Sequence, residues 1–143
     1  MCLFTEEKRK VATEDIVVYK ILRYNKLTGK CYAPYVGRRG KVYLYKKGLN
    51  VARGKESIKL DFMSCTTWTI DKGFLHAFTR KAKALPDIEL LTESTTYPSR
   101  DKYIVTKMII PKGTEYYNGE GDEICAKQLF WEEEEYNKTK INK

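Results

Sequence analysis

Short alternating stretches of apolar and polar residues, separated by turn residues, predict a mainly antiparallel β-sheet. Residues 15–23 and 103–110 are rich in β-branched side chains and predict the two principal strands. Turn residues recur about every 8–15 positions, which favours antiparallel neighbours over helix-linked parallel strands. The weaker strand candidates are residues 31–35, 41–47, 57–62, 66–70 and 128–131.

One segment has the character of a short helix. Residues 79–85 contain Ala82 and Ala84, which favour helix formation. Thr79 is a suitable N-cap residue, and Pro86 is expected to end the helix because proline cannot continue the hydrogen-bond pattern. The sequence therefore predicts a helix of about two turns between two sheet segments.

The chain length agrees with one folding unit. A chain of 143 residues is close to the commonest size of a single domain. We expect residues 1–14 to form an N-terminal arm, residues 15–131 the domain, and residues 132–143 a charged C-terminal tail that frays. The predicted fold class is α+β, mainly antiparallel sheet with one or two short helices in a single domain.

Charge is distributed unevenly along the chain, whose formal net charge is +8. From Ile16 to Lys55 there are 11 Lys/Arg residues and no Asp or Glu, whereas Thr114–Tyr136 contains 8 Asp/Glu and one Lys. The basic segment also contains six tyrosines. Cations neutralise phosphates and tyrosine rings stack on bases, so this combination indicates an anionic partner, either a nucleotide or a nucleic acid.

The alternation in residues 41–47 places Lys41, Tyr43, Tyr45 and Lys47 on one face, which we expect to face solvent. The structural alternative is that lysines on this face only protect a sheet edge from aggregation. His76 lies between apolar neighbours, which favours a packed residue over a general base. The predicted ligand-binding residues are Tyr19, Lys20, Arg23, Arg38, Arg39, Lys41, Tyr43, Tyr45, Lys47 and His76.

The sequence predicts no catalytic residue, metal site or cofactor. The four cysteines (Cys2, Cys31, Cys65, Cys125) form no closely spaced pair, so free thiols in a reducing, cytoplasmic compartment are expected. Glycine-rich dinucleotide and phosphate-binding motifs, the GxSxG elbow and the HExxH motif do not occur in the sequence. The longest apolar runs are far shorter than a membrane span, and no signal peptide is apparent, so no membrane association is expected.

Parts of the chain resemble a group of short, uncharacterised proteins of gut bacteria and their phages. The resemblance rests on the Met-Cys-Leu-Phe-Thr start, the Asp-Ile-Val-Val-Tyr-Lys strand at residues 15–20, Gly73–Phe78, and the Ile-Pro-Lys-Gly-Thr-Glu-Tyr-Tyr turn at residues 110–117. It implies a bacterial cytoplasm, including that of an infected cell.

A looser resemblance is to ADP-ribosyltransferase-type folds, which open with a strand carrying a Tyr-Arg pair and close with a proline-glycine turn before a catalytic glutamate strand. Here Tyr19-Lys20 stands at the first position, and Cys125-Ala126-Lys127 stands where a serine-to-glutamate pattern belongs. The resemblance therefore implies a nucleotide pocket that has lost its catalytic groups.

The leading functional hypothesis is a non-enzymatic binding protein for an anionic nucleotide-type ligand. If the phage resemblance holds, such a protein would sequester a host signalling nucleotide as a counter-defence. Three alternatives stay open: a nucleic-acid-binding accessory protein, an ADP-ribosyltransferase-like enzyme, and a structural or protein-interaction subunit. In the last case, the opposed basic and acidic segments would support contacts between copies in a homo-oligomer.

Overall fold

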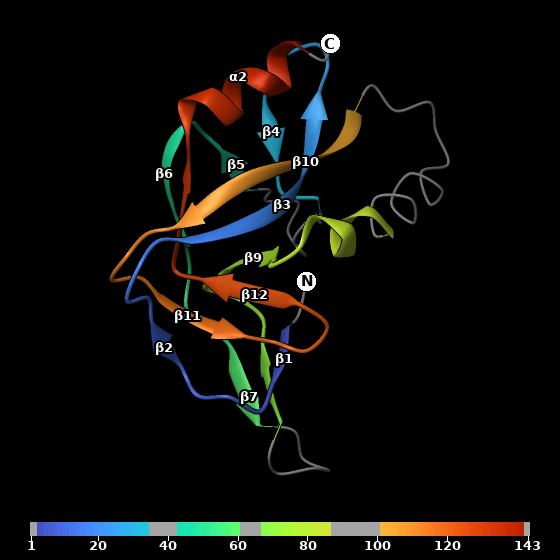
Figure 1. The fold of residues 1–143 in the computed structure, drawn as a ribbon. Coiled ribbons are helices and arrows are strands. Elements are labelled where there is room, and N and C mark those ends of the chain that lie inside the picture. Colours follow the sequence, from blue (N-terminus) through green and yellow to red (C-terminus); the bar gives the residue numbers. More distant parts are fainter. Residues whose placement is uncertain (1–2, 35–42, 61–66, 87–100, 142–143) are drawn as a thin grey trace.

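Two ten-residue antiparallel strands, β3 (Ile16–Asn25) and β10 (Asp101–Ile110), form the centre of the larger sheet. The computed structural model describes residues 3–34, 43–60, 67–86 and 101–141. The pairing of β3 with β10 runs from Ile16↔Ile110 to Asn25↔Asp101, and both strands cross the middle of Figure 1. They confirm the two principal strands expected from the β-branched stretches.

The remaining strands extend this centre on both sides and add a small second sheet. The path of the larger sheet is β2 (Lys10–Val11), β11 (Glu115–Asn118), β12 (Glu123–Ala126), β9 (Leu75–Phe78), β3, β10, β13 (Gln128–Trp131) and β6 (Gly48–Val51). Off this path, β4 (Cys31–Tyr32) pairs with both β3 and β5 (Leu44–Tyr45). The second sheet has the order β1 (Leu3–Thr5), β8 (Trp68–Ile70), β7 (Ile58–Leu60).

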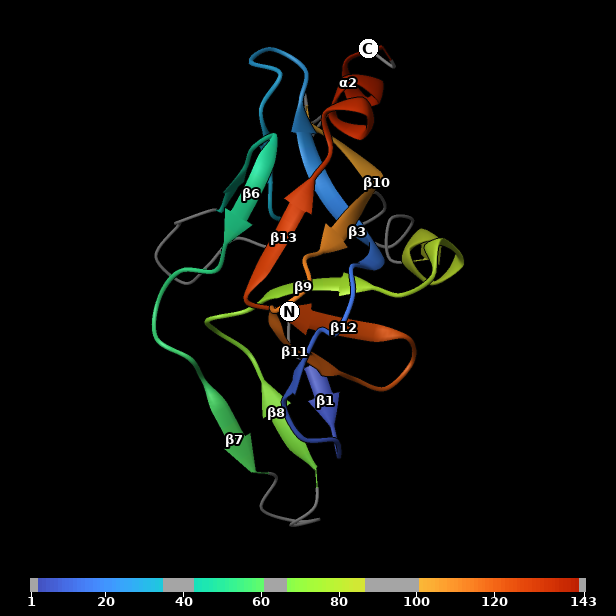
Figure 2. The ribbon, with the colours of Figure 1, turned by 60° about the vertical axis from the view of Figure 1, so that its left-hand side comes forward.

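The strands gather around two main apolar clusters. The larger cluster takes side chains from β3, β4, β5, β9, β10, β12 and β13, with Trp131 fully buried, and extends from the top of Figure 1 to β9 and β12. The smaller cluster lies in the lower half and joins Leu3 and Ile70 of the small sheet to Phe74, Tyr117 and Cys125. Figure 2 shows the small sheet below the larger one. The molecule therefore has an upper and a lower region that share the larger sheet.

Residues 81–86 form a short helix, close to the predicted range. The Thr79 hydroxyl donates to the Asp122 carbonyl oxygen at 3.2 Å, and its role as an N-cap acceptor stays a prediction. The Arg80 guanidinium binds the Asp122 carboxylate at 2.8 Å, and Ala84 packs against Ile21 and Phe78. The residues beyond Pro86 lie outside the described part of the chain, so its role as a helix stop stays a prediction.

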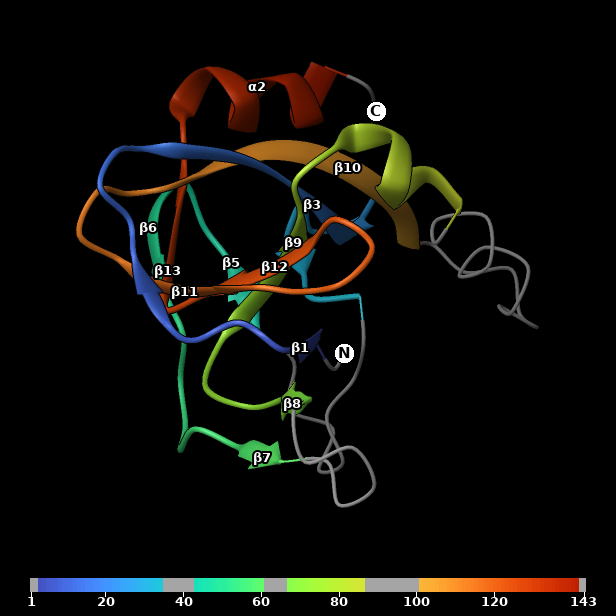
Figure 3. The same cartoon turned by 60° about the horizontal axis from the view of Figure 1, so that its bottom comes forward.

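A second helix, α2 (Glu133–Ile141), stands where the sequence predicted a fraying tail. Figure 3 shows α2 along one side of β10. Its first turn is acidic (Glu133, Glu134, Glu135) and its last turn contains Lys138 and Lys140, an order that complements the helix dipole. The fold is thus mainly antiparallel sheet with two short helices in the described ranges, as expected. No helix among these residues is long and apolar enough to cross a membrane.

Candidate functional site

A basic pocket lies at the upper end of the molecule, where three separate segments meet. The segments are the turn between β3 and β4, the turn between β5 and β6, and helix α2. The pocket has a volume of about 330 Å³, within the range typical of small-molecule sites. Its lining residues are Tyr24, Thr28, Gly29, Lys30, Cys31, Leu44, Tyr45, Lys46, Lys47, Tyr136 and Lys140.

The β3–β4 turn is held in shape by Asn25. The Asn25 Oδ1 accepts hydrogen bonds from the backbone N–H groups of Leu27 (2.9 Å) and Thr28 (3.1 Å). Such bonds from an asparagine side chain to the following backbone stabilise a turn. The Gly29 N–H donates to the Asn25 carbonyl at 2.8 Å, and Gly29 has a φ of 72°, which favours glycine. This bonding brings Thr28, Gly29 and Lys30 to the pocket wall.

The β5–β6 turn is held by a buried asparagine. Asn50 is fully buried, its Oδ1 accepts the Lys46 N–H at 2.9 Å, and its Nδ2 donates to the Lys46 carbonyl at 2.9 Å. The Asn50 side chain therefore makes the hydrogen bonds to the Lys46 backbone that a paired strand would otherwise make. Gly48 lies between Lys47 and Asn50, has a φ of 93° and begins β6. The result is that Lys46 and Lys47 stand at the pocket mouth.

Helix α2 is attached to the sheet by an aromatic contact. The rings of Tyr136 and Trp131 meet edge to face at 5.0 Å, and the Trp131 Nε1–H donates to the Thr106 hydroxyl at 3.0 Å. The Lys140 Nζ lies 4.7 Å from the Tyr136 ring centroid. The helix therefore adds one aromatic ring and one cation to the wall formed by the two turns.

The pocket wall carries a strong excess of positive charge. Lys30, Lys46, Lys47 and Lys140 line it, and no Asp or Glu is among the lining residues that the structure describes. For these four lysines, the described residues contain one ion pair, between Lys47 Nζ and Glu133 Oε1 at 3.3 Å with both groups well exposed. Such an exposed pair neutralises little charge. The acid-free segment of the sequence and the acidic C-terminal segment thus meet at this pocket.

The predicted site residues fall into four groups. Tyr45 and Lys47 line the pocket. Tyr43 lies beside Tyr45 with its hydroxyl donating to the Val51 carbonyl at 2.9 Å, and Lys20 and His76 are buried below. Tyr19 and Arg23 alternate with the buried Lys20, Leu22 and Tyr24, so they lie on the other face of β3. Arg38, Arg39 and Lys41 lie outside the described residues.

The expected solvent face of residues 41–47 is wrong in one respect. Tyr45 is 4% exposed and belongs to the core, whereas Leu44, on the opposite face, is 46% exposed. The two faces of this segment carry similar residue types, so the pattern does not decide which face is buried. Burial of the larger tyrosine ring gives the larger gain in free energy. Tyr45 therefore lines the pocket as a buried residue and cannot stack freely as a surface ring.

Sequence reasoning missed the contributions of the β3–β4 turn and of α2. Lys30 and Thr28 are not among the predicted site residues, and Tyr136 and Lys140 lie in the segment predicted to be a charged tail. The asparagine-threonine-glycine pattern before Lys30 was a usable signal, because it fixes a turn that must present the lysine. Nothing local to Tyr136 and Lys140 indicates that they reach the basic segment, since that depends on the packing of Tyr136 against Trp131.

A buried lysine lies just beneath the pocket. Lys20 is 5% exposed and its Nζ donates to the His76 carbonyl oxygen. The same Nζ lies 5.4 Å from the centroid of the Tyr45 ring. Within the described residues no carboxylate pairs with it, and burial lowers the pKa of Lys20 to about 7.

His76 is also buried, and its imidazole is held by backbone. Its Nε2 lies 2.9 Å from the Asp71 carbonyl oxygen, while Nδ1 is buried with no hydrogen-bond partner among the described residues. Burial lowers the pKa of His76 to about 4. The imidazole is therefore neutral at physiological pH and has no access to a ligand in this arrangement.

The described thiols are not activated. Cys31 and Cys125 are free and buried, and burial raises the pKa of Cys31 to about 11 and that of Cys125 to about 12. A reactive cysteine needs the opposite shift. The described residues contain no group of three or more His, Cys, Asp or Glu side chains placed to hold a metal ion.

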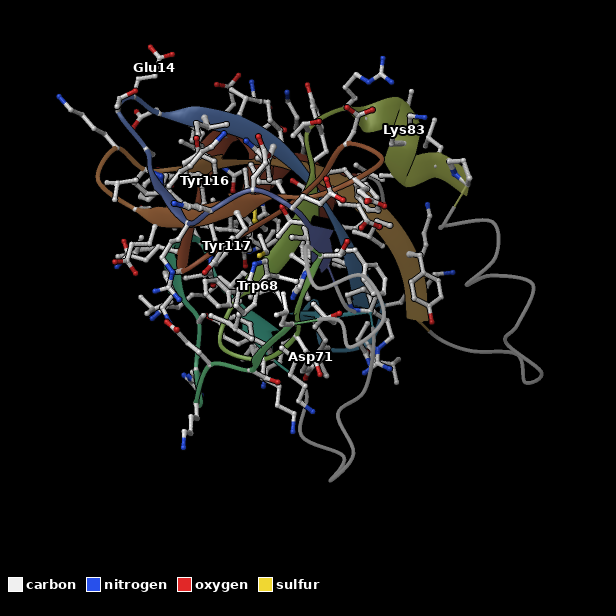
Figure 4. All side chains as sticks on the ribbon, turned by 90° about the horizontal axis from the view of Figure 1, so that it is seen from below. Glu14, Trp68, Asp71, Lys83, Tyr116 and Tyr117 are labelled. Carbon is white, nitrogen blue, oxygen red and sulfur yellow. The ribbon has the colours of Figure 1, made fainter. Side chains whose placement is uncertain are left out.

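A second cluster of cations and aromatic rings lies in the lower region. The Arg9 guanidinium lies 5.4 Å from the ring centroids of both Phe74 and Tyr117, and it pairs with Glu56 at 2.6 Å and Glu115 at 3.0 Å. Lys127 pairs with Glu56 at 2.9 Å. Figure 4 views this end from below, with Tyr117 on β11. We call Arg9, Glu56, Glu115, Tyr117 and Lys127 the Arg9 cluster.

Comparison with known proteins adds no relative to this picture. No protein-family model matches the sequence, no curated protein matches it, and no solved structure matches the fold.

Proposed function

We propose that this protein binds a small anionic ligand of the nucleotide type in the basic pocket. One observation carries the proposal: four lysines from three separate segments converge on one cavity, and none of the described residues that line it is a carboxylate. Placing like charges together is unfavourable in the free protein, and a phosphate-bearing ligand relieves that repulsion. Tyr136, which is half-buried in the wall, supplies aromatic surface for a base or sugar.

The chemistry of the surrounding groups favours binding over catalysis. The thiol that lines the pocket, Cys31, has a raised pKa, and His76 is buried and neutral. General acid–base catalysis needs a group whose pKa lies near the working pH and which reaches the substrate. A role in holding or sequestering the ligand therefore fits the described residues better than a transferase reaction. The resemblance to phage proteins stays a prediction.

Thermal-shift screening tests the proposal directly, because a ligand that binds only the folded state raises the melting temperature. The panel contains pyrophosphate, nucleoside mono- and triphosphates, cyclic dinucleotides and a 12-nucleotide single-stranded DNA. We expect at least one nucleotide to raise the melting temperature, with an affinity that titration calorimetry then measures. If no anion in the panel shifts the transition, the proposal is wrong.

Matched double variants locate the binding. Lys30→Ala/Lys140→Ala removes two cations from different walls of the pocket, and we expect it to weaken nucleotide binding at least about tenfold. Lys59→Ala/Lys83→Ala removes the same charge from exposed positions outside the pocket, and we expect an affinity within about twofold of wild type. Equal loss in both double variants would mean that net charge, and not the pocket, determines binding.

The salt dependence separates a nucleotide from a nucleic acid. A surface that neutralises many phosphates loses about 10³–10⁵ in affinity between 50 and 200 mM salt, whereas a ligand with two or three phosphates loses far less. We expect the shallow dependence. Strong binding of the DNA with a steep salt dependence would favour the nucleic-acid alternative instead.

A further inference from the structure

Lys20 is the most unusual cation in the described structure, because it is buried and has no anionic partner there. Transferring an ammonium group from water into a protein interior is costly unless an opposite charge accompanies it. The recorded partners of Lys20 are a backbone carbonyl, that of His76, and the face of the Tyr45 ring. Neither offsets a full positive charge, so the described residues leave this charge uncompensated.

The position of Lys20 connects it to the basic pocket. Tyr45 lines the pocket, and the Tyr45 ring centroid lies 5.4 Å from Lys20 Nζ. Lys20 and Tyr24 share one face of β3, and Tyr24 is a second lining residue of the pocket. The ammonium group therefore lies one aromatic layer away from the cavity, in an apolar core where screening by solvent is weak.

We propose that Lys20 is a buried electrostatic determinant of the pocket, whose positive charge strengthens anion binding and whose deprotonation weakens it. The inference rests on the proposed function of the pocket. Lys20 does not touch the ligand, and it acts through the low-dielectric layer formed by Tyr45. Binding of an anion and protonation of Lys20 are then linked, so each strengthens the other by the same factor.

The sign and size of the effect follow from simple electrostatics. Burial gives Lys20 a pKa of about 7, so it is charged below neutral pH and uncharged above it. Unit charges separated by about 10 Å at an effective dielectric constant of about 20 interact strongly enough to change an affinity about tenfold. We therefore expect anion affinity to fall at least about tenfold as the pH rises from 6 to 9.5.

The other titratable groups that face Lys20 do not change charge in this range. His76 on β9 has a pKa lowered to about 4. Burial raises the pKa of Tyr45 on β5 above its ordinary value of 10.0. The register partner of Lys20 on β10 is Thr106, an uncharged hydroxyl that accepts from Trp131. The α-amino group of the chain also titrates in this range, with an ordinary pKa of about 7.7–8.0, and its charge acts on His76. A transition near neutral pH therefore reports on Lys20 only where Lys20→Met abolishes it.

Sulfate is a suitable probe because it keeps its double charge across the whole range. Titration calorimetry of the full chain with sulfate from pH 6 to 9.5 should show the fall in affinity for wild type. Lys20→Met keeps an apolar side chain of similar length, and it should bind weakly at every pH with a nearly flat profile. Lys59→Met, which changes an exposed lysine on β7, should keep the wild-type profile.

Lysine side-chain carbon resonances of the wild-type protein give a second measurement that needs no variant. The apparent pKa of Lys20 should rise by about one unit or more when sulfate saturates the pocket, the same factor as the affinity change. If sulfate binds but Lys20→Met keeps the wild-type slope, or if the Lys20 pKa does not move, this inference is wrong and the proposed function stands. If neither sulfate nor any nucleotide binds at any pH, both are wrong.

Discussion

The Arg9 cluster and the basic pocket contain the same residue types but differ in whether carboxylates pair with their cations. In the Arg9 cluster, two cations lie against aromatic rings and two carboxylates, Glu56 and Glu115, pair with them directly. In the basic pocket, four lysines surround tyrosines and the recorded carboxylate is Glu133, in one exposed pair with Lys47. Charges that are matched inside the protein stabilise the fold, whereas charges left unmatched around a cavity are available to a ligand.

This comparison teaches that basic-aromatic composition alone does not locate a binding site. Arg9 looks like a ligand-binding residue by its neighbours, since its guanidinium lies between two rings. Its Nε, Nη1 and Nη2 nevertheless donate within the chain, to Tyr117, Glu115 and Glu56, and the hydrogen bonds to Glu56 and Tyr117 raise its pKa. The distinguishing feature is the carboxylate count around each group of cations.

The largest expected effect concerns the unmatched cation in the core. Lys20 loses its proton near pH 7 in the folded chain but near 10.4 in the unfolded chain. Between these values the unfolded state binds more protons, so the free energy of unfolding rises with pH, by at most about 1.4 kcal/mol per pH unit. Urea unfolding of wild type at pH 7, 8 and 9 should show a total gain of about 2–3 kcal/mol.

The matching variant is Lys20→Met, which should be at least as stable as wild type at pH 7 because no buried amine has to be desolvated. It should lack the Lys20 part of the rise between pH 7 and 9. A slope as steep as that of wild type would show that Lys20 is protonated throughout, and the contrast between matched and unmatched cations would lose its strongest case.

The next largest effect tests the matched side of the comparison. Arg9→Met keeps the apolar stem but removes a guanidinium that is 30% exposed and paired with two carboxylates. We expect the free energy of unfolding to fall by about 2 kcal/mol, since Glu56 and Tyr117 lose the hydrogen bonds that Arg9 donates to them. Urea unfolding with a two-state fit measures the change.

Arg53→Met is the control, because Arg53 also lies over a tyrosine ring, 5.7 Å from the centroid of Tyr43. Without a carboxylate in that contact, the loss should be at most about 0.5–1 kcal/mol. If the two arginine variants were equally destabilising, the rings and not the carboxylates would be the source of the stability in the Arg9 cluster.

The parts of the fold that the sequence predicted are those with a strong local pattern. The β-branched runs of β3 and β10 and the Pro111–Gly113 turn follow from residue type alone. The pattern fails for β9, where Leu75, His76, Ala77 and Phe78 are all buried, because a strand covered on both faces shows no alternation. It also fails for β12, in which three of four residues are buried.

The sequence predicted the residue types of the candidate site but only part of its location. The acid-free segment does supply Lys30, Lys46, Lys47 and Tyr45 to the pocket, as its composition suggested. Which face of residues 43–45 is buried, and whether residues 133–141 fold over the basic turns, depend on contacts between distant segments. The Tyr136–Trp131 contact and the Asn50 bonds to Lys46 are contacts of this kind, and no local pattern encodes them.

The smallest expected effect concerns Glu133, the carboxylate that partly matches the pocket. Its pair with Lys47 is exposed at both ends, so Glu133→Gln should change the free energy of unfolding by less than about 0.5 kcal/mol. The same change frees Lys47 for the ligand and removes a repulsive charge near the mouth. We expect affinity for pyrophosphate to rise about two- to fivefold at low salt, and to approach that of wild type as salt screens the interaction.

Glu134→Gln removes the same charge one residue further along α2, where no ion pair of Glu134 is recorded among the described residues. Titration calorimetry should therefore show a smaller gain for Glu134→Gln than for Glu133→Gln. Equal gains would mean that the pocket responds only to the net charge of the helix. A gain confined to Glu133→Gln would show that one carboxylate of the chain, paired with Lys47, partly neutralises the pocket, as Glu56 and Glu115 neutralise the cations of the Arg9 cluster.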